Sequence, residues 1–120
     1  MPGLLIVAAA GPEDPTRASI PFHIAANGAK PNGTEVAIAL AGDAAELLKP
    51  DTIANVMGLG LPPLRDLLDK CLDQNVPIYV GKGCAEARGV LPAMLTPNAT
   101  FITPPDLVRL TMEAEKVLSF

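Results

Sequence analysis

The sequence of 120 residues contains no tryptophan, one tyrosine, one histidine and only two cysteines. Two cysteines are too few for a disulfide scaffold, and with a single histidine they lack the ligand spacing of a closed structural zinc site. The few aromatic side chains offer no platform for base stacking. No run of lysine or arginine is present and the net charge is −4, which argues against direct nucleic-acid binding. We therefore expect no metal, no other cofactor and no nucleic acid.

Long apolar stretches are also missing. No segment is long and apolar enough to cross a bilayer, and residues 1–4 lack the basic region and cleavage site of a signal peptide, so we expect a cytoplasmic protein without a membrane partner. The composition, 49% hydrophobic and 18% charged, excludes disorder, and the length suits one domain over residues 1–120. So apolar a composition in a small domain leads us to expect a homo-oligomer that buries surface between subunits.

Short apolar runs alternate with helical patterns along the whole chain. Strands are predicted at residues 4–9, 35–41, 76–80 and 100–103. A first helix is predicted from Asp14–Pro15 to about residue 28, and Pro21 either kinks it or delays its regular part to about Ser19. Asp43 is predicted to cap a short helix at residues 44–48. The order of elements predicts an α/β fold, with a parallel sheet and helices on both faces.

Two longer helices complete this pattern. Pro62 and Pro63 precede an apolar stripe that includes Cys71, which we interpret as a core residue. A last helix is predicted to begin at residues 104–106, with one apolar face made of Leu107, Leu110, Ala114, Val117 and Leu118. Residues 51–60 give no clear pattern.

Three segments directly follow predicted strands: residues 11–14, 42–43 and 81–84. The carboxyl ends of parallel strands meet at one edge of a sheet, where such folds bind ligands. We therefore expect Gly11, Asp43 and Cys84 to lie near one another. Glu13, Asp14 and Asp43 could act there as paired carboxylates, but helix capping explains Asp14 and Asp43 without further assumptions and is favoured for both.

The main candidate for chemistry is Cys84, which is predicted to lie in a glycine loop between Lys82 and Arg88. These cations, and the amides of a helix predicted to start at residue 85, would favour a reactive thiolate. The alternative is a loop cysteine that only packs. Gly81, Lys82 and Gly83 could also form a backbone nest for an anion, or simply a turn that needs glycine. His23 could serve as a base, but its place in a predicted helix favours a packing or surface role.

These segments, in their order and spacing, resemble the DsrE/DsrF-like family of sulfur-relay proteins. The resemblance extends over nearly the whole chain and is carried by residues 4–9 with 11–17 and 21–25, residues 35–40 with 42–44, residues 75–80 with 84–90, and residues 114–120. It implies a three-layer α/β/α sandwich with a mainly parallel sheet, assembled as a trimer or hexamer. In some members a loop cysteine carries sulfur as a persulfide and passes it to a partner protein.

The chain departs from the family pattern at one position. In many relatives the loop begins with a cysteine, seven residues before the arginine of an Arg-Gly pair, and in the sulfur-relay members this cysteine is the carrier. Here that position is Gly81, and Cys84 matches a second cysteine found in a subset of the family. Three hypotheses follow. Cys84 carries sulfane sulfur, which would make the protein a sulfurtransferase-type carrier with a donor or acceptor protein. Alternatively, Gly11, Asp43, Gly81, Lys82, Gly83 and Arg88 line a pocket for a small anionic or nucleotide-like ligand, or the role is purely structural.

Overall fold

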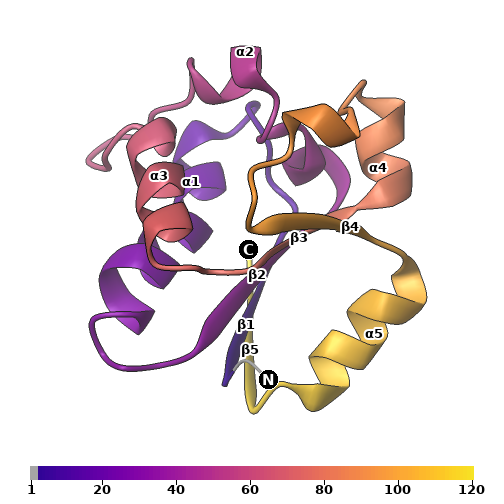
Figure 1. The fold of residues 1–120 in the computed structure, drawn as a ribbon. Helices are drawn as coiled ribbons and strands as arrows, with labels where there is room; N and C mark the ends of the chain where they lie inside the picture. The colour runs from indigo at the N-terminus through magenta and orange to yellow at the C-terminus, as the bar shows by residue number, and fades with distance from the viewer. Residues whose placement is uncertain (1–2) are drawn as a thin grey trace.

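The computed structural model describes residues 3–120. Met1 and Pro2, on which the expectation of no signal peptide partly rests, lie outside the described residues. A five-stranded sheet forms the centre of the molecule (Figure 1), in the order β4-β3-β2-β1-β5. Its strands are β1 (Leu4–Ala8), β2 (Val36–Leu40), β3 (Ile78–Gly81), β4 (Ala99–Ile102) and β5 (Lys116–Ser119). Every neighbouring pair is parallel, as the sequence predicts.

Helices cover both faces of the sheet, so the predicted three-layer α/β/α sandwich is confirmed (Figure 1). One face packs against α1 (Pro15–Ile24), α3 (Leu64–Asp73) and α4 (Lys82–Ala87), together with the shorter α2 (Pro50–Ile53). The other face packs against α5 (Pro104–Glu113) alone. Among the described residues no helix has the length and apolar character needed to span a membrane.

The central strand β2 is buried along its whole length, and its side chains divide between the two faces. Val36, Ile38 and Leu40 join the large core, whereas Ala37 and Ala39 face α5. Successive side chains of a strand point to opposite faces, so a run of only apolar residues is what a strand covered on both sides requires. This burial explains why the sequence reveals β2 so clearly.

The first helix shows how the chain leaves β1. Asp14 caps it by accepting a hydrogen bond from the Arg17 amide at 3.1 Å, and Pro15 occupies the first turn, as predicted. Pro21 lies inside α1, so the alternative start near Ser19 is wrong. A π-helical turn, Ala25–Ala29, follows. In α3, the predicted apolar stripe is confirmed by the burial of Leu64, Leu67, Leu68 and Cys71.

The C-terminal segment differs from the sequence prediction. Leu107, Leu110 and Ala114 do pack under the sheet as one face. Val117 and Leu118, however, belong to β5, which pairs in parallel with β1, so their assignment to the last helix is wrong. An edge of β1 offers unpaired backbone groups, and pairing with residues 116–119 satisfies them. The spacing of apolar residues in this segment is compatible with a helix and with a strand.

Two 3₁₀ segments complete the described chain, Gly42–Glu46 and Pro92–Met94. The first lies where the sequence predicts a short helix capped by Asp43. Ala41 occupies the N-cap position and no side chain caps the segment. The predicted capping role of Asp43 is therefore wrong, and its carboxylate has a different partner.

Candidate functional site

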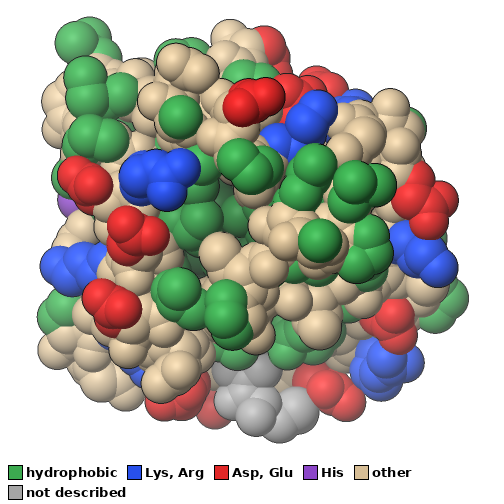
Figure 2. Space-filling model, turned by 45° about the horizontal axis from the view of Figure 1, so that its top comes forward, with side chains coloured by type: hydrophobic (Ala, Val, Ile, Leu, Met, Phe, Trp, Pro, Cys, Tyr) green, Lys and Arg blue, Asp and Glu red, His purple; other side chains and the backbone are tan. Residues whose placement is uncertain are grey.

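The segments that follow β1, β2 and β3 meet at one edge of the sheet, as predicted. Gly11 and Asp43 approach so closely that a Cβ on Gly11 would lie 2.3 Å from the Asp43 carbonyl oxygen. Figure 2 brings this end of the molecule forward, and uncharged, largely hydrophobic surface occupies the middle of the view while charged side chains lie mostly around it. The three predicted segments therefore lie along one edge of the sheet.

Cys84 does not lie in a loop, in contrast to the sequence prediction. Gly81 is both the last residue of β3 and the N-cap of α4, so Cys84 is the third residue of a helix. Neither Gly81 nor Gly83 has a positive φ, although an anion-binding nest alternates right- and left-handed conformations. The predicted glycine loop is therefore wrong, because the backbone passes directly from strand to helix, and the nest, one of two alternatives for residues 81–83, lacks its left-handed residue.

Among the glycines at the two ends of α4, Gly89, just past its C-terminal end, is the one with a positive φ. Its φ is +72°, in the left-handed region that glycine adopts without strain. The Gly89 amide donates to the Glu86 carbonyl at 3.2 Å and the Val90 amide to the Ala85 carbonyl at 2.9 Å, which is the hydrogen-bond pattern of a Schellman C-cap. The glycine of the Arg-Gly pair therefore ends the helix that carries Cys84.

The Arg88 side chain joins two of the predicted site segments. Its guanidinium donates to the Cys84 carbonyl at 3.0 Å and to the Asp43 carboxylate at 2.7 Å. The hydrogen bond to Asp43 is the largest influence and raises the pKa of Arg88; loss of hydration opposes it, and the charges of Asp43, Cys84 and Glu46 add smaller increases. Arg88 is therefore committed to Asp43 and to the backbone of α4, which explains why the Asp43 carboxylate does not cap the 3₁₀ segment.

Lys49 is not among the residues that the sequence predicts at this edge. Its ammonium donates to the Arg88 carbonyl at 2.9 Å, an oxygen at the C-terminal end of α4 where a cation is favourable. Two residues outside α4 thus bind Arg88: Lys49 its backbone carbonyl and Asp43 its guanidinium. A contact between residues so distant in sequence leaves no local signal.

The two free thiols occupy contrasting surroundings. Cys71 is fully buried in the core, and burial raises the pKa of its thiol to about 12. Its Sγ lies 3.8 Å from the Phe22 carbonyl oxygen. Cys84 is half-buried and lines an open pocket. Since the thiolate is the reactive form, Cys84 is the thiol that a reagent or partner can reach.

The pocket beside Cys84 has a volume of about 240 Å³ and an almost entirely apolar lining. It lies between the ends of β2, β3 and β4, and its walls are Ala39, Leu40, Ala41, Gly81, Lys82, Gly83, Cys84, Ile102, Thr103, Pro104 and Leu107. The wall formed by residues 102–107 was not predicted from the sequence. That wall follows the carboxyl end of β4, so the rule that pointed to the other three strand ends could have found it.

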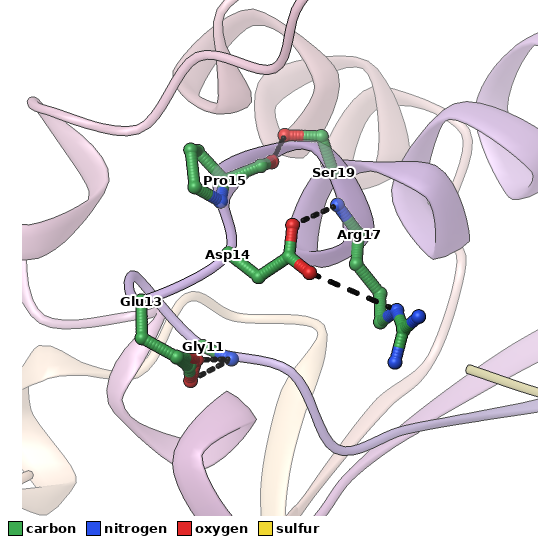
Figure 3. A network of polar contacts seen from close by, with 6 residues as sticks. All are labelled: Gly11, Glu13, Asp14, Pro15, Arg17 and Ser19. Carbon is green, nitrogen blue, oxygen red and sulfur yellow. Dashed lines mark hydrogen bonds and ion pairs between the residues drawn. The ribbon is translucent and has the colours of Figure 1, made fainter.

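A second, polar pocket of about 280 Å³ lies beyond Asp43, at the ends of β1 and β5. Glu13, Asp14, Arg17 and Asp43 supply its charges. Figure 3 shows the Glu13 carboxylate folded back onto the Gly11 amide, which donates to both carboxylate oxygens at 2.7 and 2.8 Å. Asp14 is occupied by its capping bond and by Arg17 (Figure 3). These carboxylates therefore serve the local backbone, and the predicted role of Asp14 as a cap is confirmed.

His23 takes no part in either pocket. It is half-buried on α1, and its Nδ1 lies 3.1 Å from the side-chain nitrogen Nδ2 of Asn27. This contact fits the packing or surface role that the sequence favours.

Known proteins and families resemble this chain in sequence and in fold. The sequence model of the DsrE/DsrF-like family matches residues 3–120. The crystal structure of the YchN protein from E. coli superposes with a TM-score of 0.80 at 25% identity and covers 100% of both chains. A conserved protein of unknown function from Bacteroides thetaiotaomicron has a TM-score of 0.69 at 19% identity, covering 98% of this chain and 95% of its own. Among curated proteins no significant match was found.

Proposed function

The chain belongs to the DsrE/DsrF-like family, and from that membership we propose that it is a sulfur-relay protein that carries sulfane sulfur as a persulfide on Cys84. Family membership supports the sulfur-relay role in general. The choice of Cys84 depends on a single observation: of the two free cysteines, Cys84 is the one that lines an open pocket at the carboxyl edge of the sheet.

The carrier position of the family holds Gly81 here, and the proposed carrier lies one helical turn away. A Cβ placed on Gly81 would lie 3.9 Å from the Sγ of Cys84. The Cys84 sulfur therefore lies next to the space that a side chain at position 81 would fill. This proximity supports the transfer of the carrier role from one position to the other.

The surrounding charges have distinct proposed roles. Lys82 is exposed and lines the same pocket as Cys84, so its ammonium can stabilise a thiolate that forms or leaves there. Arg88 acts as a positioning residue, because its guanidinium holds the Cys84 carbonyl and the Asp43 carboxylate together. No turnover of a small molecule is required of such a module, which exchanges sulfur with a donor or acceptor protein.

Persulfide loading tests this proposal. The protein is incubated with polysulfide and its intact mass is measured before and after treatment with a reductant, next to Cys84→Ser and Cys71→Ser variants. We expect a reversible gain of sulfur in the wild type and in Cys71→Ser, and none in Cys84→Ser. No gain in any form, or a gain that depends on Cys71, would refute the carrier role of Cys84.

The alternative of an anionic or nucleotide-like ligand receives less support from the two pockets. Apart from Lys82, the described lining of the first pocket carries no charge, and the second combines three carboxylates with one arginine. Anions favour sites with converging donors and positive charge. We therefore keep sulfur transfer as the proposed function.

Homo-oligomer formation, as a trimer or hexamer, and a cytoplasmic location remain part of the proposal. Support for assembly comes from α5 and β5, where Val108, Met112, Val117 and Leu118 expose 62, 80, 42 and 40% of their surface. Exposed large apolar side chains, where they gather, mark contact sites in soluble proteins. Light scattering coupled to size-exclusion chromatography would measure the mass in solution, and a monomer at micromolar concentration would contradict the proposal.

A further inference from the structure

The apolar pocket beside Cys84 has features that select its occupant. It is formed by small and branched aliphatic side chains from three strand ends, with Cys84 in one wall. Thr103 adds a hydroxyl, but this hydroxyl already donates to the Asp106 carboxylate at 2.9 Å. Among the described lining residues only Lys82 is charged, and it is exposed. The lining therefore offers few partners to a polar ligand.

The volume of the pocket sets the size of a suitable group. An apolar cavity of about 150 Å³ is known to bind benzene, so about 240 Å³ has room for a small aryl or branched alkyl group. Burial of an ammonium or carboxylate group in such surroundings is strongly unfavourable without a partner. Each methylene group that leaves water changes an equilibrium or rate about fourfold. The pocket thus discriminates by polarity.

We propose that this pocket binds the apolar R group of a low-molecular-weight persulfide, R–S–SH, and that a persulfide of this class is the sulfur donor to Cys84. The inference rests on the proposed carrier function and specifies its donor. An alkyl or aryl persulfide fits, whereas the charged backbones of cysteine and glutathione persulfides do not. The occupant is a small molecule, and the side chain of a partner protein is the competing possibility that the test below addresses.

The transfer step is balanced without an external oxidant or reductant. The Cys84 thiolate attacks the outer sulfur of R–S–SH, and a new S–S bond forms between Sγ and that sulfur. The S–S bond of the donor breaks, and its electron pair leaves with R–S⁻. The proton stays on the transferred sulfur, so the products are the Cys84 persulfide and the thiolate R–S⁻. Lys82 is the cation in the pocket lining that can stabilise this leaving thiolate.

The test compares two donors on a protein with one cysteine. In a Cys71→Ser background, benzyl persulfide and glutathione persulfide are each supplied at equal concentration, and the rate of sulfur gain at Cys84 is followed by intact mass. We expect benzyl persulfide to load Cys84 at least about tenfold faster, from the burial of its ring. Both rates are divided by those measured with a small free thiol, which removes differences in intrinsic reactivity.

Two matched variants locate the selectivity. Ala41→Leu adds bulk to the wall of the pocket, while Ala87→Leu adds the same bulk at an exposed position of α4 outside it. Ala41→Leu should slow loading from benzyl persulfide about tenfold and leave glutathione persulfide within twofold, since it removes space that only the ring uses. Ala87→Leu should change neither rate.

The outcomes separate this inference from the function beneath it. Equal loading from both donors, or equal slowing of both by Ala41→Leu, would refute the apolar donor and leave Cys84 a carrier loaded by a partner protein. Loading from neither donor would refute the carrier function, and the donor class with it. If Ala41→Leu fails to fold, the comparison of the two donors on the Cys71→Ser protein still tests the inference.

Discussion

Replacing Gly11 with alanine is expected to destabilise the protein and to disturb the edge that carries the candidate site. The new Cβ would lie 2.3 Å from the Asp43 carbonyl oxygen, 2.7 Å from its carbonyl carbon and 3.0 Å from its Cβ. Two of these three atoms belong to the backbone, so no flexible side chain can swing away. Residues 11 and 43 have to separate by roughly 1 Å, which is an overpacking strain.

The magnitude follows from what restrains the two segments. Overpacking costs about 1–3 kcal/mol. Separation also strains the bonds of the Gly11 amide to Glu13 and of the Gly11 carbonyl to the Asp14 amide, each contributing about 1 kcal/mol. We therefore expect a loss of about 3 kcal/mol. At about 4 °C per kcal/mol for a domain of this size, Tm falls by roughly 10 °C.

Gly83→Ala is the matched control for this change. A Cβ on Gly83 meets no atom within 4 Å, and the residue lies in α4 without a positive φ. Alanine is favoured over glycine in a helix by about 0.5–1 kcal/mol, so Tm should rise slightly. Thermal unfolding followed by circular dichroism measures both variants. Equal Tm values for the two would refute the close contact between Gly11 and Asp43.

Three further predictions concern the thiols and the start of α5. In a Gly81→Cys variant, the new Cβ would lie 3.9 Å from the Cβ of Cys84, which is within the range found in disulfides. Mild oxidation should therefore make the thiols at positions 81 and 84 unreactive toward a thiol reagent. Thiols that stay reactive would contradict the direct connection of β3 to α4. The thiol of Cys71, with its pKa at about 12, should react with iodoacetamide at pH 8 only after unfolding, whereas Cys84 reacts in the native state; rapid native labelling of Cys71, located by peptide mapping, would contradict its burial. Hydrogen bonds from the Thr103 backbone and side chain, then from Arg109, lower the pKa of Asp106 from 3.8 to about 2. This carboxylate therefore stabilises the fold above pH 4, and the stabilisation is lost as pH falls to about 2. In urea unfolding, the free energy of unfolding that Asp106→Asn loses relative to the wild type should shrink over that pH range, and a loss that is constant with pH would contradict the prediction.

The sheet and most of its helices could be predicted because burial on two faces leaves a strong local pattern. Residues 36–40 are apolar without interruption because β2 is covered on both sides. The stripe that ends at Cys71 repeats at helical spacing because one face of α3 is buried. The edge at which Gly11, Asp43 and Cys84 meet then follows from the parallel order of the strands.

Features that depend on distant partners could not be predicted in the same way. Val117 and Leu118 fit a helical face as well as a strand, and only the open edge of β1 decides between them. Two glycines around Lys82 suggested a loop, yet the backbone there needs no glycine and the one that does is Gly89. The capping role expected of Asp43 was replaced by a bond to Arg88, a residue 45 positions away.

The way α4 is held has a consequence for how sulfur would travel. The helix is continuous with β3 at one end and is closed at the other by Gly89, by Lys49 and by the Asp43–Arg88 pair. A persulfide on this helix is held at a fixed position and can move only as far as the short Cys84 side chain allows. Donor and acceptor must therefore bind at the same place in turn. The shape of the surface around Cys84, rather than the motion of a flexible segment, then decides which molecules exchange sulfur with it.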